Sequence, residues 1–213
     1  MGNDVRLGVI ICAAGRSTRM GGEDKLSFKL GGMTVLERCV TVFLKTGFVK
    51  RVIIASNREN NGFITALFGP EKGFKGYEKI IVCPGGDTRQ QSVAAALGEM
   101  GDGVDYIAVH DGARPFVSPE LIMRTLEAAA RHGAAVPGLF ARETIHVVRN
   151  GIVVSTPGRS ELFCAQTPQI FKRELLLRAY AAAERGGVSA TDDAMLASRV
   201  LAAGESCAAV QED

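Results

Sequence analysis

Short apolar runs rich in β-branched residues alternate along the chain with longer segments in which apolar residues recur at helical spacing. Continuous apolar runs of this length are typical of strands that are buried on both faces of a parallel sheet. The runs predict strands at Leu7–Cys12, Arg51–Ala55, Ile80–Cys83, Tyr106–Val109 and Ala134–Pro137. The segments between them predict helices at Thr34–Thr46, Asn60–Phe68, Arg89–Met100 and Ser118–His132. The alternation therefore predicts an α/β fold with a doubly wound, mostly parallel, Rossmann-like sheet.

One segment departs from this alternation. Arg142–Thr156 contains two β-like runs around Asn150-Gly151, a dipeptide typical of a two-residue hairpin turn. This pattern predicts a β-arm inserted at about residues 139–159 of a single domain that spans residues 1–213. Beyond the arm, the pattern predicts helices at Lys172–Arg185 and Asp192–Ala203 and a strand at Ser206–Val210.

The composition is that of an ordinary globular protein, with 46% hydrophobic and 23% charged residues. A formal net charge of only +2 argues against a broad surface for nucleic acid or an anionic membrane. The apolar run near the N-terminus is too short to span a membrane and lacks the layout of a signal peptide. Five scattered cysteines without Cys-x-x-Cys spacing predict reduced, buried thiols and no zinc site. We therefore expect a cytoplasmic protein with no nucleic-acid or membrane partner.

The loop after the first strand, Ala13–Lys25, is the first candidate site, because ligands of open α/β sheets bind beyond the carboxyl ends of the strands. Its small residues allow close approach of a ligand to backbone N–H groups that can hold phosphate oxygens. Arg16, Arg19 and Lys25 add positive charge. The loop matches neither the Walker A pattern nor the dinucleotide fingerprint. The alternative interpretation is a solvated, glycine-rich surface turn.

The loop after the third predicted strand, Pro84–Ser92, runs directly into a helix. Gly85 and Gly86 give its backbone conformational latitude, and Asp87 or Thr88 can cap the helix. Two interpretations stay open: an ordinary β-to-α turn, or a site whose backbone and Ser92 contact a nucleobase edge.

The loop after the fourth predicted strand, His110–Phe116, carries a strand-end carboxylate. Asp111 is well placed to bind Mg²⁺, which prefers carboxylate, water and phosphate oxygens. Arg114 can make a bidentate contact to a phosphate. The alternative is a buried ion pair between Asp111 and Arg114 that fixes the loop. We interpret His110 as structural.

Two later clusters complete the candidates. Arg159 and Gln166–Gln169 are polar groups beside apolar segments. Thr191 with the two following aspartates forms either a ligand contact or a plain helix start, with Thr191 as the cap and the two acids in the first turn. The chain shows no Ser/His or Cys/His arrangement typical of covalent catalysis. Loops that hold anions, together with one candidate metal carboxylate, favour phosphoryl-type transfer, which depends on positioning and charge neutralisation.

Seven motifs in a fixed order cover nearly the whole chain: AAGRSTRMGGEDK, GGDTRQQSV, VHDGARPF, RETI, Gly158-Arg159, AQTPQIF and TDDA. With these motifs the chain resembles the 2-C-methyl-D-erythritol 4-phosphate cytidylyltransferases of the non-mevalonate isoprenoid pathway. The resemblance implies a nucleotidyltransferase type of sheet and transfer of a cytidylyl group from CTP to the polyol phosphate, with Mg²⁺ or another divalent cation as cofactor.

The resemblance also implies a role for each matching position. On the CTP side it implies that Ala13, Ala14 and Gly15 form a backbone platform for the nucleotide. Gly86 and Ser92 match the positions that read the base, and Gly85 matches the position that shapes their turn. The catalytic cations that it implies are Arg19 and Lys25 at the α-phosphate and Arg159 at the acceptor.

On the acceptor side, the resemblance places Asp111 near Mg²⁺ and the sugar phosphate. It implies that methylerythritol phosphate contacts Arg114, Thr144, Arg159 and Thr191. In this family the arm that carries Thr144 and Arg159 comes from a partner subunit, which implies a homodimer.

Two departures from the family pattern are present. His146 stands where relatives often carry a lysine in the arm. Relatives also carry an Asn-x-Lys segment after the last strand, and the lysine of that segment joins their active site; the printed sequence ends at Asp213, before such a segment.

Other interpretations remain beside this one. A ribitol 5-phosphate cytidylyltransferase shares most of these loops, although RETI and the GAR of VHDGARPF favour methylerythritol phosphate. A non-catalytic nucleotide-binding relative would keep the fold without turnover. An NAD-dependent dehydrogenase is set aside because the first loop lacks the required glycine spacing.

Overall fold

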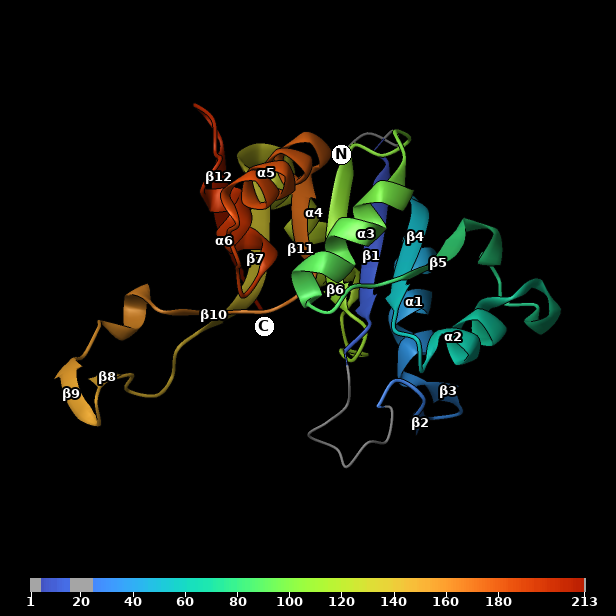
Figure 1. Ribbon diagram of the computed structural model, residues 1–213, viewed down its shortest axis with the longest axis horizontal. Helices are drawn as coiled ribbons and strands as arrows, with labels where there is room; N and C mark the ends of the chain where they lie inside the picture. The colour runs from blue at the N-terminus through green and yellow to red at the C-terminus, as the bar shows by residue number, and fades with distance from the viewer. Residues whose placement is uncertain (1–4, 16–24, 213) are drawn as a thin grey trace.

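The computed structural model describes residues 5–15 and 25–212. Its main feature is a sheet of eight strands in the order β10-β7-β11-β6-β1-β4-β5, with β12 also paired to β7 (Figure 1). These strands are β1 (Leu7–Ala13), β4 (Val49–Ser56), β5 (Ile80–Pro84), β6 (Tyr106–Asp111), β7 (Gly133–Phe140), β10 (Phe163–Ala165), β11 (Gln169–Lys172) and β12 (Ser206–Gln211). All six strands predicted from the sequence are therefore present, and each is at least one residue longer than predicted.

The sheet is mostly parallel, as predicted. Strand β1 lies between β4 and β6 and is parallel to both, and β4 is parallel to β5. Strand β11 is antiparallel and lies between β6 and β7, and β10 is antiparallel to β7. The sequence analysis missed β10 and β11 because each is only three or four residues long, below the length at which apolar periodicity identifies a strand.

Helices cover both faces of the sheet (Figure 1). They are α1 (Val35–Lys45), α2 (Asn61–Phe68), α3 (Arg89–Met100), α4 (Pro119–His132), α5 (Arg173–Gly186) and α6 (Asp193–Ser198). The side chains of β1 alternate between two cores: Val9 and Ile11 join the cluster that contains the apolar faces of α1, α2 and α4, and Ile10 joins that of α3, α5 and α6. A strand buried on both faces is apolar at every position, which explains the continuous apolar run.

Several helix ends agree with the predicted capping residues. The Ser118 hydroxyl caps α4, with Pro119 in its first turn, and Thr88 forms a capping box with Gln91 at the start of α3. The prediction for α6 was wrong in two respects. Asp192, not Thr191, is the N-cap, because the Asp192 carboxylate accepts from the Met195 N–H. The helix also ends five residues earlier than predicted, before a turn at Gly204 with φ of +82°.

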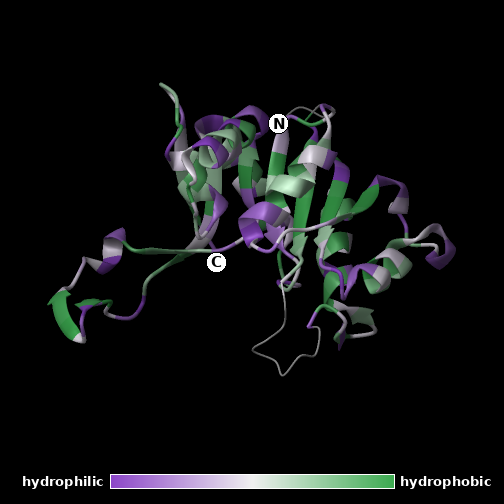
Figure 2. Ribbon diagram, viewed as in Figure 1, coloured by the Kyte–Doolittle hydropathy of each residue, from purple (hydrophilic) through white to green (hydrophobic). Residues whose placement is uncertain are grey.

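The inserted arm projects from the body of the domain (Figure 1). At its tip, β8 (Val147–Arg149) and β9 (Ile152–Ser155) form the predicted hairpin. Asn150 and Gly151 form its turn with positive φ angles of 49° and 78°, as a two-residue hairpin turn requires. The hairpin strands are apolar but exposed, and they stand out as hydrophobic in Figure 2.

The remaining short elements are the hairpin β2 (Lys29–Leu30) and β3 (Met33–Thr34) and the 3₁₀ helices η2 (Pro70–Lys72), η3 (Tyr77–Lys79) and η4 (Arg159–Glu161). No helix in the described part of the chain is both long and apolar enough to cross a bilayer. All five cysteines are free thiols. The expectation of uniformly buried thiols was wrong, because Cys164 is exposed on β10.

Candidate active site

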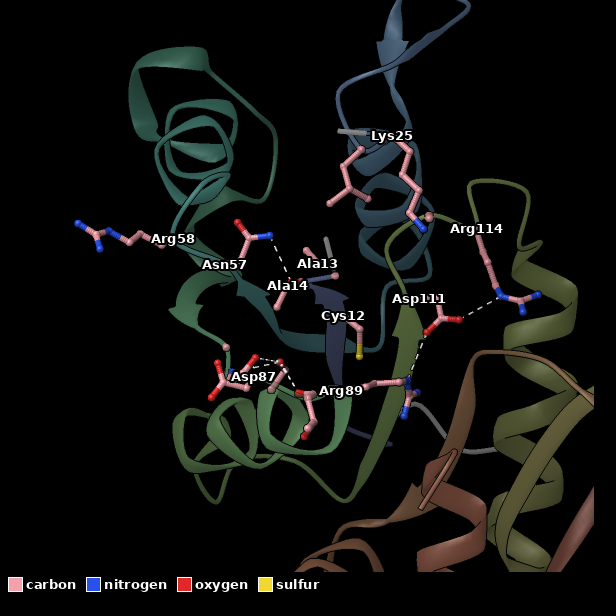
Figure 3. A pocket seen from close by; sticks show the side chains of 17 residues that line it. Cys12, Ala13, Ala14, Lys25, Asn57, Arg58, Asp87, Arg89, Asp111 and Arg114 are labelled. Atoms are coloured by element: carbon pink, nitrogen blue, oxygen red, sulfur yellow. Dashed lines mark hydrogen bonds and ion pairs between the residues drawn. The ribbon is translucent and has the colours of Figure 1, made fainter. Parts of the chain in front are cut away.

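A cavity of about 870 Å³ lies at the carboxyl ends of β1, β4, β5 and β6 (Figure 3). This is the edge of the sheet at which the sequence analysis expected the ligand site. The residues that line it are Cys12, Ala13, Ala14, Gly15, Lys25, Leu26, Asn57, Arg58, Gly85, Gly86, Asp87, Thr88, Arg89, Ser92, Asp111, Ala113 and Arg114.

Most of the predicted site residues meet at this cavity. Those that line it are Ala13, Ala14, Gly15, Lys25, Gly85, Gly86, Ser92, Asp111 and Arg114. Arg19 lies outside the described residues. Thr144, Arg159 and Thr191 are exposed and are not part of the cavity lining that the described residues form.

The charge of the described lining is positive. Four cationic side chains line the cavity together with two carboxylates; the cations are Lys25, Arg58, Arg89 and Arg114, and the acids are Asp87 and Asp111. The global charge of the chain is close to zero, so this excess is local. A cavity with such a lining attracts a polyanion.

The first loop offers backbone donors to the cavity. Ala13 is the last residue of β1, and Ala14 and Gly15 follow it on the cavity wall. Within the described part of the chain, the N–H groups of Ala14 and Gly15 have no hydrogen-bond acceptor. Exposed N–H groups beside small side chains can bind phosphate or base oxygens.

The third loop, Pro84–Ser92, packs closely against Ala14 of the first loop. A Cβ at Gly85 would lie 2.7 Å from the Cβ of Ala14 and 2.7 Å from the Oγ of Ser92, so this position requires glycine. The Ser92 hydroxyl accepts from the Gly86 N–H at 3.1 Å and donates to the Thr88 carbonyl at 2.9 Å. The Ser92 side chain therefore shapes this turn, and its contact with a base stays a prediction.

Two arginines flank the carboxylate of Asp111 (Figure 3). The Arg114 Nε donates to one carboxylate oxygen at 3.2 Å, and the Arg89 Nε lies 3.6 Å from the other. The Asp111 and Arg114 side chains are 36% and 42% exposed, so this pair is not the buried ion pair that the sequence left open. Asp111 is thus oriented by the protein and accessible to a ligand.

The segment between β10 and β11 contacts the loop His110–Phe116 and positions it. The register between β10 and β7 differs from that between β11 and β7, because residues 166–168 interrupt the ladder. The interruption places the Gln166 amide oxygen against the Arg114 guanidinium, and the Thr167 hydroxyl accepts from the Asp111 N–H at 3.2 Å. The AQTPQIF motif therefore positions both charged residues of the fourth loop.

His110 is structural, as predicted. Its ring is fully buried, its Nε2 lies 3.1 Å from the Arg114 carbonyl and its Nδ1 lies 3.0 Å from the Thr167 hydroxyl. Since the carbonyl must accept, the network assigns the proton to Nε2 and leaves Nδ1 to accept from Thr167. Burial lowers the pKa of His110 to about 4. The ring is therefore neutral at physiological pH and joins the two ends of the loop.

A buried charged network lies beneath the cavity. Arg89 forms an ion pair with the carboxylate of Asp193, with a nitrogen–oxygen distance of 2.7 Å, and the Tyr180 hydroxyl donates to the other oxygen of that carboxylate at 2.5 Å. Asp193 is fully buried. Burial alone would lower the pKa of Arg89, but the charge of Asp193 raises it, so the guanidinium stays charged. Burial raises the pKa of the adjacent Cys12 thiol to about 12, which keeps it protonated and unreactive.

The sequence analysis did not assign Asn57, Arg58 or Arg89 to the site, although all three line the cavity. Asn57 and Arg58 directly follow β4, and Arg89 opens α3. The signal for Asn57 and Arg58 was available, because the loop after the second predicted strand ends at the same edge of the sheet as the three loops that were considered. Arg89 lies in the third loop, Pro84–Ser92, which was considered, but its pairing with Asp193 was not predictable because Asp193 is distant along the chain.

Comparison with known proteins gives the family. The profile of the family described as IspD, 2-C-methyl-D-erythritol 4-phosphate cytidylyltransferase, matches residues 7–212. A relative with this name from Bacillus mycoides is 38% identical over 193 residues, which cover 90% of this chain and 84% of the relative. One from Bacillus licheniformis is 37% identical over 206 residues, covering 96% and 86%.

A solved structure agrees with these relatives. The crystal structure of the 2-C-methyl-D-erythritol 4-phosphate cytidylyltransferase from Thermus thermophilus superposes with a TM-score of 0.75 at 34% identity, and the match covers 98% of this chain and 90% of that one. Fold, motif order and the family profile agree over the same residues. The chain belongs to the 2-C-methyl-D-erythritol 4-phosphate cytidylyltransferase family.

Proposed function

We propose that this protein transfers the cytidylyl group of CTP to 2-C-methyl-D-erythritol 4-phosphate, forming 4-diphosphocytidyl-2-C-methyl-D-erythritol and pyrophosphate. The observation that carries the proposal is the cationic cavity at the carboxyl edge of the sheet, with its wall of small residues, in a chain of this family. Such a cavity fits a nucleoside triphosphate, because backbone N–H groups and cations hold phosphate oxygens.

The reaction is an in-line displacement at phosphorus. A phosphate oxygen of the acceptor forms a new bond to the α-phosphorus of CTP, and the bond from that phosphorus to the bridging oxygen of pyrophosphate breaks. The electron pair of the broken bond leaves with pyrophosphate. A phosphate monoester is already an oxyanion near pH 7, so the attack requires no general base.

Charge neutralisation is the main task of the protein in this step. Lys25 lines the cavity, and we assign it, together with Arg19, to the charge that develops at the α-phosphate. The platform of Ala13, Ala14 and Gly15 holds the nucleotide, and the turn at Gly86 and Ser92 reads its base. We assign Arg114 to the phosphate of the acceptor.

A divalent cation fits the donor set at Asp111. Within residues 5–15 and 25–212, no three His, Cys, Asp or Glu side chains gather to bind a metal by themselves. Mg²⁺ usually takes only one or two protein carboxylates and completes its shell with water and substrate phosphates, so the accessible carboxylate of Asp111 suits it. When bound, Mg²⁺ would neutralise phosphate charge beside this residue.

We further propose that two chains form a dimer through the arm. Thr144 and Arg159 lie on the arm, are exposed and do not line their own chain's cavity. The hairpin exposes Val148, Ile152 and Val153 by 54%, 68% and 54%, which is unfavourable in water unless another surface covers them. The arm of one chain would then bring Thr144 and Arg159 to the acceptor in the partner's cavity. Thr191 completes the acceptor contacts from the chain's own α6 side.

A pyrophosphate-release assay with two acceptors tests the proposal. We expect release with CTP, Mg²⁺ and methylerythritol phosphate, and little with ribitol 5-phosphate. Release only with ribitol 5-phosphate would identify the other polyol phosphate as the acceptor. CTP binding by calorimetry without release from either acceptor would instead identify a non-catalytic relative.

The five free thiols support a reducing compartment such as the cytoplasm, which fractionation of the source cells would test.

A further inference from the structure

We propose that the loop after β4 is a positioning brace that holds the two walls of the CTP cavity in their binding geometry. The brace consists of the Ser56 carbonyl and the side-chain amides of Asn57 and Asn60. The inference rests on the proposed function, because it assigns the two walls to CTP. It adds residues that act through the platform rather than on the reacting atoms.

Asn60 holds the carbonyl at the end of β1. Its Nδ2 donates to the Ala13 carbonyl at 2.8 Å, and its Oδ1 accepts from the Asn57 N–H at 3.0 Å. Asn60 is 5% exposed as a whole residue and does not line the cavity. Although Asn60 precedes α2, its side chain makes no helix-capping hydrogen bond. Its amide is therefore committed to the first loop.

Asn57 holds the next carbonyl along the same loop. Its Nδ2 donates to the Ala14 carbonyl at 3.2 Å (Figure 3). Its Oδ1 accepts from the N–H groups of Glu59 and Asn60, each at 2.9 Å, which fixes the direction of the amide. Two consecutive carbonyls of the platform are thus held by two side chains of one short loop.

The same loop also holds the opposite wall. The Ser56 carbonyl accepts from the Gly85 N–H at 2.7 Å. Gly85 packs against Ala14 at a distance that excludes a Cβ. The distance between the two walls is therefore set through residues 56–60.

Peptide geometry explains how the brace acts on a ligand. The carbonyl of one residue and the N–H of the next belong to a single planar trans peptide, in which they point in opposite directions. Holding the carbonyls of Ala13 and Ala14 therefore fixes the directions of the N–H groups of Ala14 and Gly15. These are the two donors that find no acceptor within the described residues. The brace preorganises them for CTP and leaves the acceptor side untouched.

The test replaces each amide donor while keeping its shape. Asn60→Asp removes the donor to Ala13 and retains the acceptor for the Asn57 N–H, and Asn60→Leu removes the donor without adding charge. Asn61→Asp and Asn61→Leu are the matched controls, because the Asn61 amide donates to the Ser56 hydroxyl at 2.7 Å and to neither platform carbonyl. Each variant is measured for CTP affinity by calorimetry, for KM of both substrates, for kcat and for Tm.

We expect both Asn60 variants to raise the Kd and the KM for CTP by about tenfold, the loss typical of one well-placed hydrogen bond. The KM for the acceptor should not change, kcat should stay within about threefold, and the Asn61 controls should bind CTP like the unmodified protein. Asn57→Asp should act in the same direction.

Three outcomes would overturn the inference. A lower Tm with unchanged CTP affinity would make Asn60 merely structural. Equal losses for CTP and acceptor would indicate general distortion of the site. A loss with Asn60→Asp but not with Asn60→Leu would show that the added charge, not the lost donor, causes the effect. The proposed transfer reaction fails separately, if the unmodified protein binds CTP without releasing pyrophosphate; the calorimetric comparison then still tests the brace.

Discussion

The nucleotide side of the molecule and the arm differ in how their functional groups are held. On the nucleotide side, hydrogen bonds from neighbouring loops fix the carbonyls of Ala13 and Ala14 and the N–H of Asp111, and the buried carboxylate of Asp193 holds Arg89. On the arm, the apolar side chains are exposed and Arg159 donates to the Arg142 carbonyl of the same arm.

This difference indicates a division of labour. The nucleotide side is built to its binding geometry within one chain, as expected for a site that stabilises charge through preorganised donors. The arm has the features of a surface that becomes ordered against a partner, with apolar strands and exposed polar residues at its base. Substitutions on the two sides should therefore have different effects on stability, turnover and assembly.

The largest expected effect is on stability, from the buried network of the nucleotide side. Asp193→Ala leaves the half-buried guanidinium of Arg89 without its closest partner, and we expect a loss of about 3–5 kcal/mol in the free energy of unfolding. Tyr180→Phe removes only one hydrogen bond and should cost about 1 kcal/mol. Urea denaturation measures both, and equal small losses would contradict the importance of this network.

The next effect is on turnover. Lys25→Ala should lower kcat by about 10²–10³, the range for removing one group that stabilises transition-state charge, with a smaller change in CTP binding. Lys29→Ala, an exposed lysine of the β2–β3 hairpin, is the matched control and should have no effect. Single-turnover kinetics and CTP calorimetry separate the two quantities. Equal losses in binding and turnover would assign Lys25 to ground-state binding.

The third effect is a pH dependence of stability that comes from His110. Its pKa is about 4 in the folded protein and about 6.5 when unfolded, so between these values the unfolded chain binds more protons. The stability from the neutral ring is fully present above pH 6.5 and is lost as the pH falls towards 4, by about 3 kcal/mol. His110→Gln should flatten this part of the curve of unfolding free energy against pH. An unchanged slope would contradict the buried, neutral assignment.

The smallest effect on folding, with a larger one on assembly, is expected at the arm. Ile152→Asp places a charge on the exposed hairpin, so the free energy of unfolding should stay within about 0.5 kcal/mol while the dimer weakens. Sedimentation measures the dimer, and activity should fall with it at low protein concentration. Tyr77→Asp, at an exposed aromatic residue outside the arm, is the control. A dimer unaffected by Ile152→Asp would contradict the proposed interface.

Local patterns predicted the parts of the fold that depend on local chemistry. The continuous apolar run from Leu7 identifies a strand buried on both faces, and Ser118-Pro119 identifies a helix start, whatever the rest of the chain does. The short strand Gln169–Lys172 was missed because its place between β6 and β7 is decided by long-range pairing.

The candidate site was predictable to a similar extent. All four loops that line the cavity follow predicted strands, and the small and charged residues of the three loops that were considered are visible in the sequence. The brace was not, because Asn57 and Asn60 have the composition of an ordinary turn, and only the fold places their amides on the carbonyls of Ala13 and Ala14. The cap of α6 shows the same limit of local patterns at a single residue: Thr191 was the predicted N-cap, but Asp192 is the N-cap in the structure.

The central claim is that each active site combines the nucleotide side of one chain with the arm of its partner. Mixing two inactive variants tests this claim most directly. Lys25→Ala disables the nucleotide side of a chain, and Arg159→Ala disables its arm. If each cavity receives the arm of the partner, a mixed dimer contains one cavity with an intact lysine and an intact arginine. Dissociating and reassociating equal amounts should then restore about a quarter of the activity of the unmodified protein. No recovery, in a sample shown by sedimentation to contain mixed dimers, would contradict the account.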